Sequence, residues 1–301
     1  MVKSMNEIIE YAKRQGRRKL AVAVAQDEDV LISVHQAYMK GLIDVCLVGD
    51  KEKIFEISDR LQIDISDFEI IKEADEIKAA KAAVELAGSG SVDMLMKGII
   101  KTADLLRIVL DRGSGLRTDR LLSHISAIEV ENYHKLLFIT DGGLNIAPDV
   151  KQKAEIIQNA VYVANSLGIE RPKVAVLASV EVVNPVMQAT LDAAVLSKMA
   201  DRGQIKNCII DGPLAMDNAV SLEAARHKGI VSDVAGDADI LVAPDIESGN
   251  TIQKALVFLG KAKSCGIIAG ARVPLVVTSR ADNYEAKLYS ISLASIVSSL
   301  K

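Results

Sequence analysis

Short apolar runs alternate with amphipathic segments along most of the chain. Residues 19–25 (KLAVAVA) and 44–48 are apolar at nearly successive positions, which predicts buried strands. Residues 28–39 and 75–87 repeat apolar side chains at helical spacing and are followed by glycine, which predicts helices. This alternation predicts an α/β fold with a parallel sheet wound by right-handed crossovers, whose ligands bind outside the carboxyl ends of the strands.

The alternation is interrupted once, at residues 112–120 (RGSGLRTDR). Glycine, serine and arginine dominate this segment, so we interpret it as a loop and a candidate linker between domains. Two apolar strands are predicted after it, at residues 124–130 and 135–140. The short stretch between them has no room for a long helix, so we expect them to pair antiparallel or to cross between domains. The alternation then resumes with a long helix at residues 149–167.

Composition describes the core and excludes some classes of partner. Apolar residues make up 50% of the 301 residues and aromatic residues only 3%, so the core is aliphatic, as in proteins with buried parallel strands. The formal net charge of -4 gives no basic surplus for binding nucleic acid.

Cysteine and histidine spacing argues against two further kinds of site. The three cysteines, Cys46, Cys208 and Cys265, are far apart, which indicates a reducing compartment and neither a disulfide framework nor a zinc site. No two of the four histidines have metal-ligand spacing, so we expect no metal. The N-terminus lacks a signal-peptide core, and no apolar run approaches the roughly 20 residues of a membrane span. We therefore expect a soluble cytoplasmic protein.

The strongest candidate site follows the last predicted strand, at residues 274–277. Ser279 and Arg280 come next, before an amphipathic helix that we expect from about Asp282 to the C-terminus, with Ile291 among the residues on its inner face. A helix start, its dipole and a guanidinium together favour binding of a phosphoryl or acyl-phosphate group. The alternative reading is structural. Asp282 and Glu285 fit a capping box, Arg280 can pair with any surface acid, and Ser279 can be a turn residue.

Another strand end carries several cations, in residues 97–107 (KGIIKTADLLR). Lys97, Lys101 and Arg107 supply positive charge, and Thr102 is a candidate cap of the helix that follows. The alternative is that Asp104 and Arg107 form an ordinary surface pair at i,i+3 spacing.

Three further loops are predicted after strands. Residues 141–148 form a glycine-rich turn, which more often reflects tight geometry than phosphate binding. Residues 211–217 contain a Gly-Pro turn, and we expect Asp217 to cap the next helix. In residues 244–250 we expect Asn250 to precede and cap a helix.

Taken together, these segments resemble the phosphate acetyl/butyryl transferase family. The resemblance covers essentially the whole chain, and its most specific parts are DGPLAMDNAV (residues 211–220), PDIESGN (244–250) and TSRAD (278–282). The chain is more similar to phosphate butyryltransferases than to acetyltransferases. The resemblance implies two α/β domains with mainly parallel sheets and an inter-domain cleft, of the isocitrate dehydrogenase-like type. We expect residues 1–120 plus 270–301 to form the first domain and residues 121–269 the second.

The resemblance also implies an activity. Such an enzyme moves a short-chain acyl group, butyryl or branched, reversibly between coenzyme A and inorganic phosphate. Coenzyme A is then a substrate, no cofactor is tightly bound, and the protein is a homodimer or a higher homo-oligomer. The alternatives are a phosphate acetyltransferase, a catalytically silent acyl-CoA- or phosphate-binding homologue, and an NAD-dependent decarboxylating dehydrogenase. The last would need an aspartate cluster for a metal that the sequence does not show.

Site residues carry over position by position from the family. Ser279 and Arg280 match its catalytic pair, and Arg107 matches its phosphate-side arginine. Thr102 and Asn250 match residues of the family's cleft. We expect substrate to contact these two and also Lys97, Gly249 and Asp282.

One position departs from the family pattern. The acetyltransferases have an aspartate in the final helix, proposed as the base that deprotonates the coenzyme A thiol, and the matching residue here is Ala286. Glu285 takes that role, or another acid does, or no dedicated base is needed.

Overall fold

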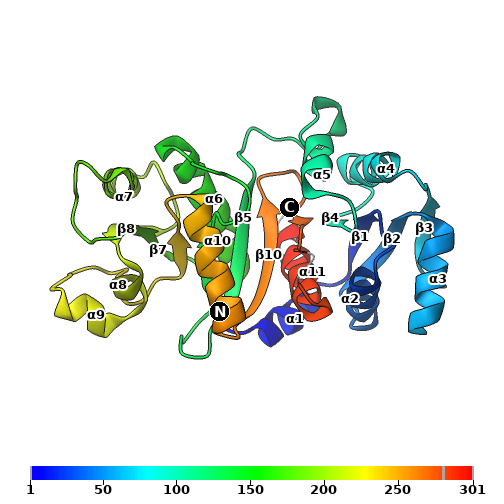
Figure 1. The fold of residues 1–301 in the computed structure, drawn as a ribbon, viewed down its shortest axis with the longest axis horizontal. Helices are drawn as coiled ribbons and strands as arrows, with labels where there is room; N and C mark the ends of the chain where they lie inside the picture. The colour runs from blue at the N-terminus through cyan, green and yellow to red at the C-terminus, as the bar shows by residue number, and fades with distance from the viewer. Residues whose placement is uncertain (1, 280–281, 300–301) are drawn as a thin grey trace. The chain divides into compact units, whose positions relative to one another are not determined.

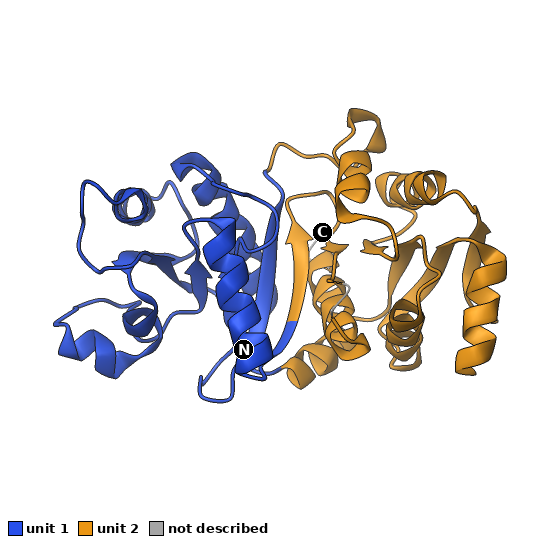
Figure 2. Cartoon of the chain, viewed as in Figure 1, with its two compact units in different colours: residues 1–4, 121–264 blue, residues 5–120, 265–301 orange. Residues whose placement is uncertain are grey.

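The computed structural model describes residues 2–279 and 282–299. Arg280, one of the predicted catalytic residues, lies outside the described residues, as do residues 1, 281, 300 and 301. Contacts divide the chain into two compact units, shown in Figure 2. Unit 1 comprises Met1–Ser4 and Leu121–Ser264, and unit 2 comprises Met5–Arg120 and Cys265–Lys301.

Unit 2 contains a mainly parallel sheet in the strand order β3-β2-β1-β4-β11-β10. In that order the strands are β3 (Glu69–Lys72), β2 (Ile43–Gly49), β1 (Arg18–Ala23), β4 (Met94–Lys97), β11 (Leu275–Val276) and β10 (Lys263–Ala269), which belongs to unit 2 from Cys265 onward. The first five pair parallel, and β10 pairs antiparallel with β11. The inner strands are buried on both faces, as their apolar runs predict.

Helices cover both faces of this sheet. They are α1 (Met5–Arg14), α2 (Glu28–Met39), α3 (Lys51–Leu61), α4 (Glu76–Gly88), α5 (Thr102–Val109) and α11 (Tyr284–Ser298), with a short 3₁₀ helix at Arg112–Ser114. In Figure 1, α2, α3 and α11 lie on one side of the sheet and α4 and α5 on the other. Asp27, Asp50 and Asp75 accept backbone N–H groups at the starts of α2, α3 and α4, which satisfies donors that these helices leave unpaired.

Helix α11 is buried all round, contrary to the amphipathic helix expected from the sequence. Every residue from Lys287 to Ser298 is buried, and the helix packs against α1 and α2. Its serines are compatible with burial because their hydroxyl groups donate to carbonyls of the preceding turn. Ser290 donates to Ala286 O at 2.7 Å and Ser292 to Leu288 O at 2.8 Å. The sequence did not reveal this, because burial of the outer face depends on the packing of α1 and α2 around the helix.

Unit 1 is also α/β, with the strand order β5-β6-β9-β7-β8. Its strands are β5 (Ser123–Glu129), β6 (Leu137–Thr140), β9 (Ile240–Val242), β7 (Lys173–Leu177) and β8 (Ile209–Leu214). Its helices are α6 (Val150–Ser166), α7 (Gln188–Asp201), α8 (Met216–Val220), α9 (Leu222–His227) and α10 (Ile246–Lys254), which continues as a π-helix at Ala255–Leu259. Strands β5 and β6 pair antiparallel, as one of the two expectations had it, and the other pairs are parallel. The prediction of an α/β fold with mainly parallel sheets is confirmed.

Two loops predicted in unit 1 belong to regular elements. Strand β8 continues to Leu214, and Ala215 is the N-cap of α8, so Asp217 lies inside that helix and pairs with Lys228 at 3.1 Å. The predicted cap at Asp217 is therefore wrong. The cap at Asn250 is also wrong, because Asp245 accepts the N–H of Ser248 at 2.8 Å and starts α10 earlier.

A buried ion pair joins α6 to α7 in unit 1. Lys153 Nζ lies 2.6 Å from Asp192 Oδ2, and both side chains are 5% exposed. Gln188 Nε2 donates to the other carboxylate oxygen at 2.7 Å. Each charge depends on the other, because burying either one alone in an apolar interior is expensive.

We predict that Lys153→Met destabilises the protein by about 3–5 kcal/mol, because it leaves the Asp192 carboxylate buried without a counter-charge. Urea denaturation followed by circular dichroism measures this change. The double variant Lys153→Met/Asp192→Leu should recover most of the loss, since both charges are then gone. Equal losses in the single and double variants would show that packing, rather than charge pairing, accounts for the effect.

Candidate active site

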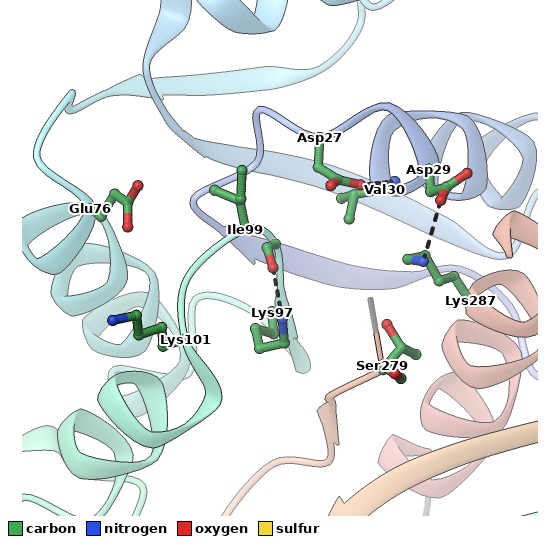
Figure 3. A pocket seen from close by; sticks show the side chains of 11 residues that line it. Asp27, Asp29, Val30, Glu76, Lys97, Ile99, Lys101, Ser279 and Lys287 are labelled. Atoms are coloured by element: carbon green, nitrogen blue, oxygen red, sulfur yellow. Dashed lines mark hydrogen bonds and ion pairs between the residues drawn. The ribbon is translucent and has the colours of Figure 1, made fainter. Parts of the chain in front are cut away.

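A pocket lies at the carboxyl ends of β4 and β11 in unit 2, where the sheet topology predicts ligand binding (Figure 3). Its volume is about 450 Å³, within the range of small-molecule sites. The lining residues are Asp27, Asp29, Val30, Glu76, Lys97, Gly98, Ile99, Lys101, Thr278, Ser279 and Lys287. Two predicted site residues, Lys97 and Ser279, are therefore brought to one cavity.

One wall of the pocket is shaped by a close approach of two backbones. Gly98 donates to Ala23 O at 2.8 Å, and a Cβ at Gly98 would lie 2.0 Å from Val24 O. Only glycine fits there without moving β1. Val24 itself has φ 62°, a left-handed conformation that is a genuine outlier for a β-branched residue. Strained backbone of this kind clusters at functional sites, which supports a functional role for the pocket.

Lys97 ends strand β4 and enters the pocket from a buried position. Lys97 is only 6% exposed, and its Nζ donates to Gly98 O at 3.0 Å and to Ile100 O at 3.3 Å. These carbonyls belong to the turn that leads into α5. Lys97 therefore places a positive charge in the wall of the pocket and orders the adjacent turn at the same time.

The segment after β11 is organised by Asp282, although not as a helix cap. Asp282 Oδ2 accepts the N–H of Ser279 at 2.7 Å, and the Asp282 N–H donates back to Ser279 O at 3.2 Å. The N-cap of α11 is Asn283, whose side chain accepts the N–H of Ala286 at 3.0 Å. The predicted capping box of Asp282 and Glu285 is therefore wrong, and Glu285 lies exposed in the first turn.

Lys287 is a pocket residue that sequence reasoning missed. It is 4% exposed, and its ammonium group points toward Asp29 on α2, at 3.8 Å (Figure 3). It also donates to the carbonyl of Asp282. One signal was present in the sequence, because Lys287 lies four residues before Ile291 and hence on the face of the helix expected to point inward.

Two predicted residues on α5 lie away from this pocket's lining. Arg107 is 75% exposed in its side chain and pairs with Asp104 at 3.1 Å, so the surface-pair alternative holds for this conformation. Thr102 is the first residue of α5, and Lys101 occupies the N-cap position, so the predicted cap at Thr102 is wrong.

The remaining predicted residues, Gly249 and Asn250, lie in unit 1 near the start of α10. Their backbone packs against the glycine-rich turn, since a Cβ at Gly142 would meet Gly249 C at 2.9 Å. Asn250 Nδ2 donates to Gly142 O at 3.0 Å. Asp141 holds the turn by accepting the N–H groups of Gly143 at 2.8 Å and of Leu144 at 3.0 Å. This turn is therefore ordered by its own hydrogen bonds and its contact with α10.

Metal and membrane features were searched over residues 2–279 and 282–299. In that part of the chain, no group of three or more histidine, cysteine, aspartate or glutamate side chains is arranged to hold a metal ion. Among the same residues, no helix has both the length and the apolar character to cross a bilayer.

Comparison with known proteins identifies the family. The family model "Phosphate acetyl/butaryl transferase" matches residues 4–89 and 75–295. A phosphate butyryltransferase from Clostridium acetobutylicum is 50% identical over 301 residues, which covers 100% of both chains. A phosphate acetyltransferase from Thermotoga maritima is 48% identical over 292 residues, covering 97% of this chain and 99% of the relative.

A solved structure agrees with these relatives. The branched-chain phosphotransacylase from Enterococcus faecalis V583 superposes with a TM-score of 0.83 and 32% identity, covering 93% of this chain and 99% of that one. The resemblance inferred from the motifs is confirmed. This chain belongs to the phosphate acetyl/butyryl transferase family and is a phosphate acyltransferase.

Proposed function

We propose that this protein moves a short-chain acyl group, butyryl or a branched short-chain group, between coenzyme A and inorganic phosphate. The main support is the 50% identity to a phosphate butyryltransferase over the full length of both chains. The likeness to a branched-chain phosphotransacylase supports the same acyl class. Acetyl transfer is the second candidate, favoured by the 48% identity to a phosphate acetyltransferase.

The proposed chemistry is direct acyl transfer while both substrates are bound. In the direction of coenzyme A acylation, the thiolate attacks the carbonyl carbon of the acyl phosphate, and the bond from that carbon to the phosphate oxygen breaks. Phosphate leaves with the bonding electron pair. We propose that Ser279 donates a hydrogen bond to the developing oxyanion or to the phosphate, and that Arg280 offsets the charge on the leaving group. Ser279 lines the pocket of unit 2, which supports this assignment.

Arg107 is proposed as the second guanidinium that holds the phosphate. This role requires its side chain to leave Asp104, with which it forms an exposed i,i+3 pair. Such pairs stabilise a helix by only about 0.2–0.5 kcal/mol, whereas a charge-assisted hydrogen bond to phosphate contributes about 1.5–3 kcal/mol. Replacing the pair with Asp104 by a hydrogen bond to phosphate is therefore favourable. The exposed pair seen without substrate is compatible with the proposed role of Arg107.

Two acids are candidate bases for the coenzyme A thiol. Glu285 is proposed because it neighbours Ala286, yet its carboxylate is exposed at the start of α11. Asp29 is the other candidate acid, since it lines the pocket. Asp27 also lines it but is engaged in capping α2. Alternatively, the positive charge in the pocket favours the thiolate without any base.

The remaining proposals concern binding residues and assembly. Lys97, Thr102 and Asp282 in unit 2, with Gly249 and Asn250 in unit 1, are proposed to contact substrate, with coenzyme A as a substrate and no tightly bound cofactor. The protein is proposed to be cytoplasmic and a homodimer or higher homo-oligomer, which light scattering after size exclusion tests.

Assays of thiol release test the proposed reaction. With inorganic phosphate present, we expect release of free coenzyme A from butyryl- and isobutyryl-CoA, and the rate should not depend on NAD or Mg²⁺. Acetyl-CoA and propionyl-CoA complete the series. A faster reaction with acetyl-CoA would favour the acetyltransferase alternative. Absence of thiol release from every acyl-CoA would leave a catalytically silent binding protein.

Arg280→Ala should lower kcat at least a hundredfold with coenzyme A and butyryl phosphate. Removing one well-placed charged donor to a transition state costs about 3 kcal/mol, which corresponds to that factor. Arg280→Lys is the matched control, because it keeps the charge and loses the planar fork. Turnover by Arg280→Ala near that of the wild type would reject the assigned role.

Asp282 and Asn283 can be separated by paired alanine variants. Asn283→Ala removes the cap of α11 and should lower the free energy of unfolding by about 1 kcal/mol while kcat changes little. Asp282→Ala releases the N–H of Ser279 and should lower kcat more than it lowers stability. Kinetics and urea denaturation of both variants measure these changes. The reverse pattern, with Asp282→Ala the less stable and fully active variant, would contradict the assignment.

A further inference from the structure

We infer that Lys287, together with Lys97, forms a cationic subsite for the phosphate ion in the pocket of unit 2. The inference rests on the proposed function, since it names the residues that receive the phosphate in that reaction. The two lysines come from different elements. Lys97 ends β4, Lys287 lies in the first turn of α11, and both line the same cavity of about 450 Å³ (Figure 3).

The burial of Lys287 is the first observation. Lysine is almost never fully buried without a charged partner, and this residue is 4% exposed. Among the described residues its ammonium group has two partners, the Asp282 carbonyl and the Asp29 carboxylate at 3.8 Å. That separation is too long for a hydrogen bond, and the Asp29 side chain is 47% exposed, so solvent weakens the attraction. An ammonium group has three N–H donors, so Lys287 retains capacity for an anion.

The distribution of charge in the pocket is the second observation. Its lining includes three acids, but all of them lie where solvent reaches. Glu76 is exposed, Asp29 is half-exposed, and Asp27 is partly exposed and engaged in capping α2. The deeply buried charges, Lys97 and Lys287, are both positive. An anion entering the pocket therefore meets fixed positive charge at depth, where low dielectric strengthens the interaction.

The start of α5 adds a third contribution on the same side. Lys101 lines the pocket and is the N-cap of α5, and within the described part of the chain its side chain makes no capping hydrogen bond. The first N–H groups of α5 therefore have no side-chain cap in the described residues, and the helix dipole is positive at this end, beside the Lys101 that lines the pocket. A phosphate held by Lys97 and Lys287 would lie in this favourable field.

A structural role for Lys287 is the competing explanation. Lys287 contacts the carbonyl of Asp282 and the carboxylate of Asp29, so it can hold the Ser279 segment against α2. Two substitutions separate the explanations. Lys287→Met removes both contacts and the positive charge, whereas Asp29→Asn weakens the contact with α2 and leaves the ammonium group in place.

The test measures the dissociation constant of inorganic phosphate by ³¹P NMR line broadening, beside KM for phosphate with butyryl-CoA. We expect Lys287→Met to weaken phosphate binding and to raise this KM about tenfold or more, because a charge-assisted donor is lost. Its affinity for coenzyme A should stay within about twofold of the wild type. Asp29→Asn should bind phosphate as well as the wild type or more tightly. Lys81→Met, an exposed change on α4 outside the pocket, is the matched control and should behave as the wild type.

Three results would overturn the subsite. They are unchanged phosphate affinity in folded Lys287→Met, equal loss in Lys287→Met and Asp29→Asn, or a loss of coenzyme A affinity alone. If Lys287→Met does not fold, Lys97→Met takes its place, with the same expected loss and the same contradicting results. If the proposed function is wrong, the result is different: the wild type then binds phosphate but releases no thiol from any acyl-CoA.

Discussion

Positive charge held inside an aliphatic protein is the constraint on which the pocket of unit 2 depends. Burying an ammonium group is costly unless oxygen atoms surround it, and here backbone carbonyls provide much of that compensation. Lys97 is held by the carbonyls of Gly98 and Ile100, and Lys287 by that of Asp282. Carbonyl groups solvate a cation without neutralising it. The pocket therefore keeps net positive charge at depth, which a full lysine–carboxylate pair such as Lys153 with Asp192 does not.

The sheet of unit 2 makes this arrangement possible. Strand β1 pairs with β4 through Ala23 and Lys97, and the chain then turns so closely that Gly98 touches Val24. This turn directs the side chain of Lys97 inward instead of into solvent. The left-handed backbone of Val24 lies at the same point. Backbone strain just after β1, a required glycine and a buried cation thus occur together at the ends of two paired strands, which is a consistent sign that the local structure serves binding rather than stability.

Much of the fold followed from the sequence, because buried parallel strands have an unambiguous pattern. The run at residues 19–25 predicts a buried strand, and residues 19–23 belong to β1. Helix boundaries were less predictable, since several residues near a boundary can cap. Asp282 and Asn283 both suit an N-cap, and only the tertiary position of Ser279 makes Asp282 bind its N–H and leaves the cap to Asn283. Local sequence cannot resolve such a competition.

Site residues could be predicted where a reactive or charged side chain follows a strand. They could not be predicted where membership of the site depends on how deeply a residue is buried. Lys97 and Ser279 were identified because each follows a strand. Lys287 was missed because a lysine in a helix is normally solvated, and its burial depends on α1 and α2 packing around α11. That packing is non-local, and so it leaves no motif at position 287 itself.

The same burial bears on the alanine at position 286. Side chains at successive helix positions do not face each other, so a carboxylate at position 286 would not pair directly with Lys287. Its negative charge would still lie within a few ångströms and would lower the positive potential that an anion meets in the pocket. Under the proposed mechanism, the positive charge that binds phosphate also favours the thiolate over the thiol, so a single feature can serve both substrates. The absence of an acid at position 286 is then compatible with acyl transfer, because the positive charge of Lys287 favours the thiolate in the reaction without a base at that position.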